Sequence, residues 1–109
     1  MPSTNVVRGN LQFSALIGPT LSPVLVAANT TAEQTLTVTG LLVGDFVNVI
    51  KPTAQAGLGI VNARVSAANT LAITFSNNTG SGITPTASEI YTIAIDRPEN
   101  LALPTTLQV

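Results

Sequence analysis

Cysteine and histidine are both absent from this 109-residue chain. Without cysteine there is no disulfide framework and no thiolate zinc site, and without histidine the commonest general base and metal ligand is missing. A serine or threonine nucleophile would lack its usual base. The only lysine, Lys51, precedes Pro52 at the expected end of a strand, which is a poor place for a buried neutral amine. We therefore predict that the chain is not an enzyme and has no catalytic residue, metal site or cofactor.

Charge is also scarce, at 8% of residues with a net charge of −1. The four basic residues are scattered, so no basic stripe exists to displace counterions from a nucleic acid. No apolar run reaches the ~18 residues of a membrane-spanning helix, and the N-terminus lacks the basic-then-apolar pattern of a secretion signal. The acidic residues fall at expected strand ends or in loops, which disfavours a catalytic carboxylate pair. We expect neither a nucleic acid nor a membrane as a partner.

What the chain does have is alternation of apolar and polar residues in short runs, which indicates half-buried β-strands. In three of these runs the apolar residues share one face: Val61, Ala63 and Val65; Leu71, Ile73 and Phe75; and Tyr91, Ile93 and Ile95. Strands are expected at 34–39, 46–50, 59–66, 70–76 and 89–96, with 23–28 a candidate first strand. We predict one all-β domain, an antiparallel β-sandwich or a small jelly-roll-like barrel, over residues 21–97.

Turn residues separate the expected strands. The tetrapeptide Ala-Ala-Asn-Thr occurs at 27–30 and again at 67–70, each time before a Leu-x-(Val/Ile)-Thr stretch. Asparagine tolerates the left-handed conformation, so the echo is either one good turn sequence used twice or a duplicated strand-turn-strand unit. The polar loop 77–85 is rich in turn formers and is expected to be exposed and mobile.

Both ends of the chain are expected to be extended arms, residues 1–20 and 98–109. Their leucines and aromatics are too apolar for solvated tails, so the arms should dock, either on a neighbouring molecule or on the parent domain. The residues assigned to this subunit or capsid interface are Leu11, Phe13, Leu16, Ile17, Leu101, Leu103 and Leu107. Arg64 should point outward, and Arg64 and Arg97 are each either ordinary exposed arginines or partners in an ion pair across a subunit boundary. Phe46 is expected to be buried or docked.

A family resemblance covers about two-thirds of the chain. It is carried by residues 51–65 (Lys-Pro-Thr-Ala-Gln-Ala-Gly-Leu-Gly-Ile-Val-Asn-Ala-Arg-Val), 69–75 (Asn-Thr-Leu-Ala-Ile-Thr-Phe) and 78–80 (Asn-Thr-Gly), and it extends back to 39–45 and forward to 84–86 and Tyr91. These stretches resemble a module of small structural proteins in tailed bacteriophages. The short chain favours a capsid decoration (cement) protein, and a head-fibre or tail-fibre module for attachment or for receptor or glycan recognition is the alternative.

The resemblance implies a place in the virion and a set of partners. A decoration protein would be made in the host cytoplasm and would sit on the outer capsid surface, bridging neighbouring subunits of the major capsid protein. It would assemble with itself as a homotrimer or a dimer. No catalytic residue is carried over.

Overall fold

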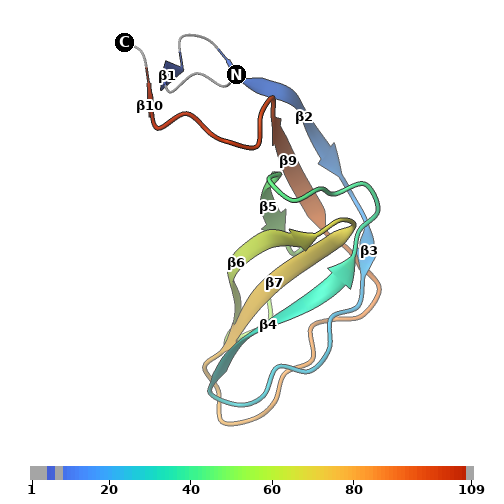
Figure 1. Ribbon diagram of the computed structural model, residues 1–109. Coiled ribbons are helices and arrows are strands. Elements are labelled where there is room, and N and C mark those ends of the chain that lie inside the picture. Colours follow the sequence, from blue (N-terminus) through green and yellow to red (C-terminus); the bar gives the residue numbers. More distant parts are fainter. Residues whose placement is uncertain (1–4, 7–8, 108–109) are drawn as a thin grey trace.

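The computed structural model describes residues 5–6 and 9–107, and in this part of the chain it contains strands and no helix. Figure 1 shows how the strands are arranged. In chain order they are β1 (Asn5–Val6), β2 (Leu11–Ile17), β3 (Thr20–Leu21), β4 (Thr30–Thr37), β5 (Phe46–Ile50), β6 (Leu58–Ala67), β7 (Thr70–Asn77), β8 (Glu89–Ile90), β9 (Thr92–Pro98) and β10 (Thr106–Leu107). The predicted all-β class is confirmed.

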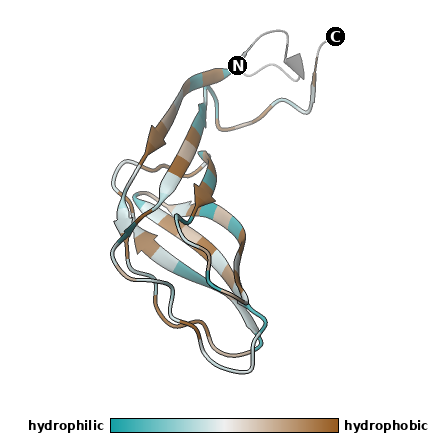
Figure 2. Cartoon of the chain, turned by 180° about the vertical axis from the view of Figure 1, so that it is seen from behind, coloured by the Kyte–Doolittle hydropathy of each residue, from teal (hydrophilic) through white to brown (hydrophobic). Residues whose placement is uncertain are grey.

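Two three-stranded antiparallel sheets, β4-β7-β6 and β2-β9-β5, form the body of the molecule. Their inner faces pack together, so the architecture is a β-sandwich. The antiparallel pair β3-β8 extends the ribbon made by β2 and β9, and β1 pairs with β10 in parallel. The strands show alternating hydrophobic and hydrophilic bands (Figure 2). This alternation is the physical basis of the two-layer packing, because every second side chain points to the same face.

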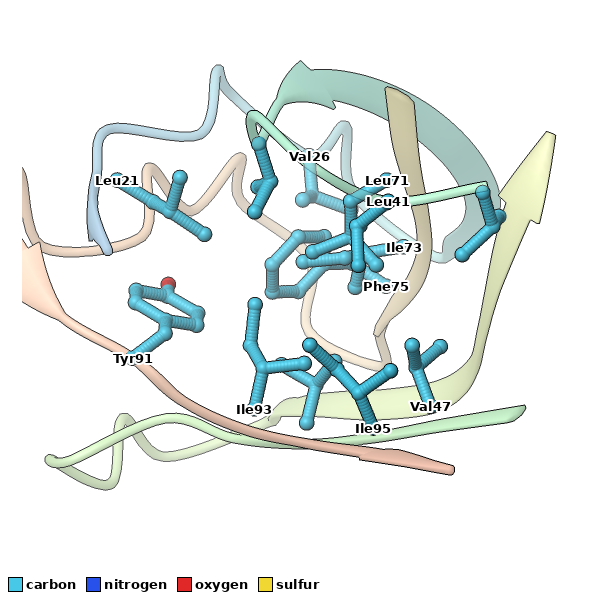
Figure 3. Close-up of a cluster of buried hydrophobic side chains, with 13 residues drawn as sticks. Leu21, Val26, Leu41, Val47, Leu71, Ile73, Phe75, Tyr91, Ile93 and Ile95 are labelled. Atoms are coloured by element: carbon cyan, nitrogen blue, oxygen red, sulfur yellow. The ribbon is translucent and has the colours of Figure 1, made fainter. Parts of the chain in front are cut away.

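The core lies between the central strands of the two sheets. Leu71, Ile73 and Phe75 of β7 point toward Tyr91 and Ile93 of the β8–β9 ribbon, and all five are 0% exposed (Figure 3). Each such side chain contributes ~1.5–3 kcal/mol when it leaves water. The predicted shared faces of these two runs are confirmed.

The third predicted face, on β6, is wrong in its first member. Register shifts between Ile60 and Asn62, so Ile60 lies opposite the core residue Phe75, and Val61 is left 63% exposed. A β-bulge places two residues of one strand against one of its partner and reverses the side on which the following residues point. Ile60 therefore shares the inner face with Ala63, and Val61 does not.

The expected N-terminal arm is also different from the structure over part of its length. Residues Leu11–Ile17 form strand β2, which pairs with β9 and completes the second sheet. The pairing satisfies backbone groups of β9 that would otherwise form an open edge. Residues 1–4 and 7–8 of this arm, and 108–109 of the C-terminal one, lie outside the described residues. No strand forms over 23–28, where only Val26 makes an isolated bridge, to Ile83.

The two Ala-Ala-Asn-Thr stretches fold into the same turn. Asn29 and Asn69 have φ angles of 51° and 60°, and the following threonine hydroxyl donates to the carbonyl of Ala28 or Ala68 at 2.9 and 3.1 Å. Asn69 closes the β6–β7 hairpin, whereas Asn29 leads from a loop into β4. The different flanks favour one turn sequence used twice over a duplicated unit.

The loop after β7 is held more firmly than predicted. Asn77 is only 1% exposed, and its side-chain amide donates to the carbonyls of Val26 and Ser81 at 3.0 and 2.8 Å. Its oxygen accepts from the backbone and the hydroxyl of Thr79. Farther along, Pro85 is fully buried. The expectation of an exposed loop is therefore wrong at Asn77 and Pro85, where the chain is buried, although residues between them are exposed.

Candidate interaction surface

An ion pair between Arg97 and Asp45, called the clamp below, lies at the end of the sandwich from which the C-terminal segment departs. Arg97 donates from Nε to Asp45 Oδ1 and from Nη2 to Asp45 Oδ2, both at 2.8 Å. The Asp45 side chain is 1% exposed, and Oδ2 also accepts the backbone N–H of Leu42 at 3.0 Å. The hydrogen bond from Arg97 is the main reason that the pKa of Asp45 lies below its usual value. Arg97 therefore pairs within its own chain.

An apolar end surface lies beside this clamp. The Arg97 guanidinium sits 4.7 Å from the centroid of the Phe13 ring, a cation–π contact between β9 and β2. Next to it is a hollow of about 460 Å³ whose lining includes Leu42, Val43 and Leu101. These three residues are all exposed. We call Phe13, Leu42, Val43 and Leu101 the end surface.

The C-terminal segment, residues 99–107, continues from the end surface. It runs away from the two sheets in Figure 1, and its leucines Leu101, Leu103 and Leu107 are 78%, 63% and 74% exposed. The backbone N–H of Glu99 donates to the Asn10 carbonyl at 2.8 Å, which anchors the start of the segment. The leucines therefore bury little surface in their own chain.

The remaining residues of the predicted interface lie on β2, and they differ in whether they face solvent or the core. Leu16 is exposed on the outer side of its sheet, since its partner Ala94 is flanked along β9 by the core residues Ile93 and Ile95. Ile17 packs against the core cluster. Ile17 therefore docks on its own domain, while Leu16 is open to a partner. Leu11, at the start of β2, is 47% exposed.

A groove of about 590 Å³ with both polar and apolar lining lies between the edge strands β5 and β6. Its lining includes Phe46, Asn48, Asn62 and Arg64. Phe46 was expected to be buried or docked; it is 64% exposed, so it is not buried in its own domain, and docking on another molecule stays a prediction. Arg64 points outward as predicted, and it forms two hydrogen bonds of 2.9 Å with Glu33 of the same chain. This bond lowers the pKa of Glu33.

The described residues offer little chemistry elsewhere. They contain no group of three acidic side chains placed to hold a metal ion and no helix long and apolar enough to cross a membrane. Lys51 is engaged by Glu89, with 3.0 Å between Nζ and Oε1, and Glu89 also accepts from the Thr53 hydroxyl at 2.6 Å. The threonine hydrogen bond is the leading cause of the lowered pKa of Glu89.

Comparisons with known proteins leave the family open. No family model, no curated protein and no solved structure matches this chain.

Several exposed apolar residues were missed by sequence reasoning. Leu42 and Val43 sit in a turn, where three consecutive apolar residues from Leu41 onward are unusual and could have marked a surface. Strand β5 is apolar at four of its five positions, which means that both of its faces are apolar. That signal could have identified Phe46 and Ile50.

Proposed function

We propose that this chain is a capsid decoration (cement) protein of a tailed bacteriophage. It binds the outer surface of the head and stabilises contacts between neighbouring major capsid protein subunits. The observation that carries the proposal is the C-terminal segment, whose leucines are exposed and bury little in their own chain. The resemblance of residues 39–91 to phage structural modules supplies the partner and the location, the outer capsid of the virion. It also supplies self-assembly, as a homotrimer or a dimer.

The energetics of such a clamp are favourable in an assembly of many copies. A buried leucine contributes ~1.5–3 kcal/mol, so three of them supply a useful but modest affinity at one site. A shell presents the same site many times, and copies that are linked to one another gain from the raised effective concentration. A segment that stands away from its own sheets can reach across a joint between neighbouring subunits.

The test uses phage heads that lack this protein, to which the purified chain is added. Full-length protein should bind at a copy number comparable with the major capsid protein on a stained gel, and it should raise the temperature at which the heads release DNA. A variant with Leu101, Leu103 and Leu107 all changed to serine should bind at least ~1,000-fold more weakly, because three leucines at ~1.5 kcal/mol each lose ~4.5 kcal/mol.

The matched control changes exposed apolar residues at the other end of the molecule (Figure 1). Val24 and Leu25, in the loop between β3 and β4, are exposed in the same way. The double change of these residues to serine should leave head binding unaltered. Wild-type protein that fails to bind heads would refute the decoration function. Equal binding by wild type and the triple-serine variant would refute the role of the segment.

A second candidate function, recognition of a glycan or receptor by a fibre module, is supported by the β5–β6 groove. An exposed aromatic ring beside amide side chains offers a stacking surface with hydrogen-bonding groups, which is how many sugar sites are built. Here Phe46, Asn48 and Asn62 all line the groove. Binding of host surface glycans to the purified chain, lost in Phe46→Ala and retained in Val24→Ala, which lies outside the groove, would favour this function.

A further inference from the structure

The two outer faces of the sandwich differ in chemistry. The outer face of β4-β7-β6 is mainly polar: β4 contributes Thr31, Glu33, Thr35 and Thr37, and β7 contributes Thr70, Thr74 and Ser76, with Val61 at the β6 bulge as an exposed apolar residue. The Arg64–Glu33 pair spans this face, and Ala72, opposite Arg64 in register, is 0% exposed. An antiparallel sheet with one face in water is expected to look like this.

The outer face of β2-β9-β5 and its extension into β8 has the opposite character. Leu16, Phe46, Ile50 and Ile90 are 72%, 64%, 60% and 61% exposed. The register places Leu16 beside Ala94, and Ala94 beside Asn48, which lies between Phe46 and Ile50 on β5. Ile90 lies over Gly18, where a Cβ atom would come within 3.1 Å of its Cγ2. We call Leu16, Phe46, Ile50, Ile90 and Ala94 the outer apolar face.

We propose that the outer apolar face binds a second copy of this chain, sheet against sheet. The size of the face fits this partner. At roughly 200 Å² for a large apolar residue in full exposure, the four exposed side chains present about 500 Å². A stable interface buries about 800 Å² on each partner, and homodimer interfaces are about 65% apolar. With its polar rim of Ser14, Asn48 and Thr92, the face has the extent and composition of one half of such an interface.

The charge on the face also fits a second copy better than a charged surface. Within the described part of this face the ionisable group is Asp96, and its carboxylate accepts a hydrogen bond from the Ser14 hydroxyl. A nearly uncharged face can meet its own image across a two-fold axis without repulsion. Two sheets packed in this way lie ~10 Å apart, so Ala94 on the central strand would face Ala94 of the other copy. This inference does not depend on the capsid role.

Cross-linking tests the geometry directly, because the chain has no cysteine. A distance of ~10 Å is too long for a disulfide, so a short bis-maleimide is the appropriate reagent. Ala94→Cys should give a covalent dimer rapidly. Thr74→Cys, at the part-exposed middle of the central strand of the other sheet, is the matched control and should cross-link slowly. Equal rates for the two variants would overturn the assignment of the face.

Sedimentation equilibrium tests the association itself. Wild type should be dimeric at micromolar concentration, and Phe46→Asp should weaken the dimer by ~100-fold or more because the new charge would be buried. Thr35→Asp, on the polar face, should leave it unchanged, and thermal unfolding should confirm that both variants fold. A wild-type monomer at high concentration would refute the proposal. So would a dimer that survives Phe46→Asp but is lost when residues 101–109 are deleted, since association would then run through the C-terminal segment. Loss of head binding by a protein that remains dimeric would refute the proposed function and leave this inference standing.

Discussion

Replacing Asp45 by alanine should destabilise the domain more than any other single change of a charged residue. The carboxylate is 1% exposed and accepts hydrogen bonds from Arg97 Nε, Arg97 Nη2 and the Leu42 backbone. Removing one partner of a buried ion pair typically costs ~3–5 kcal/mol, because the other charge loses its compensation. Arg97 remains partly solvated and keeps its hydrogen bond to the Gly40 carbonyl. We therefore expect a loss near the lower limit, about 3 kcal/mol.

The expected loss is a large share of the ~5–15 kcal/mol that stabilises an ordinary domain. Urea unfolding should show a lower midpoint with an unchanged m-value, since the same surface is exposed on unfolding. The control is Glu33→Ala, which removes a similar two-bond arginine pair on the solvent-exposed face of the other sheet. Its midpoint should hardly move, because exposed ion pairs contribute little.

The pH dependence follows from the lowered pKa of Asp45. The unfolded carboxyl titrates near its ordinary pKa of 3.8, and the folded one has a lower pKa. The stabilisation by the clamp is therefore fully present above that value and is lost as the pH falls through the folded pKa. Asp45→Ala should not show the part of the stability loss at low pH that comes from protonation of this carboxylate. If Asp45→Ala and Glu33→Ala shift the midpoint equally, the clamp does not hold the end of the sandwich and the reasoning is wrong.

Three further predictions concern buried or strained polar residues. The Tyr91 hydroxyl is buried without a hydrogen-bond partner in the described part of the chain, so Tyr91→Phe should be neutral or stabilising by up to ~1 kcal/mol in urea unfolding. Burial raises the pKa of Tyr91 from 10.0 to about 12, and the charge of Glu89 is the second cause. The free energy of unfolding of the wild type should therefore fall by about 2–3 kcal/mol as the pH rises from 10 toward 12. Tyr91→Phe should not show this fall. Asn69→Ala removes a residue that tolerates the left-handed conformation and the 2.7 Å hydrogen bond from the Gly40 N–H, so it should lower the free energy of unfolding by ~2 kcal/mol. The same change at Asn29, whose φ is also positive, should lower it by less. Asn77→Ala should lower the free energy of unfolding by ~2–3 kcal/mol and increase hydrogen exchange at the amides of Val26 and Thr79. Asn78→Ala, a change of its exposed neighbour, should alter neither.

The part of the fold that sequence reasoning recovers is the part that depends on local periodicity. The runs around Ile73 and Ile93 place large apolar residues at every second position, and both strands occupy the centres of their sheets with the predicted face inward. The bulge in β6 has no such signature, because Ile60 and Val61 are equally suited to a core position. Which of the two points inward is decided by pairing with β7, and pairing is not a local property.

The same limit applies to the candidate surfaces. The sequence indicates that Leu101, Leu103 and Leu107 are too apolar for a solvated tail, and the structure places them in the open, but what they contact depends on another molecule. Arg97 and Asp45 are 52 residues apart, and no spacing rule connects them. Arg97 could therefore be recognised only as an unassigned charge. Strand β2 could not be predicted for a related reason. The apolar residues of Leu11–Ile17 do not alternate regularly, and the segment is a strand because it pairs with β9.

Strand β5 connects the two kinds of surface on this molecule. Val47 and Val49 point into the core, while Phe46 and Ile50 point outward. An edge strand with apolar residues on both faces and unpaired backbone on one side is a site for uncontrolled association. A monomer under selection for solubility would be expected to carry a charge at one of the outward positions, as β4 does with Glu33. That neither position is charged is most simply explained if this face is covered in the assembled protein, and the cross-linking rates at Ala94 and Thr74 will decide whether a second copy covers it.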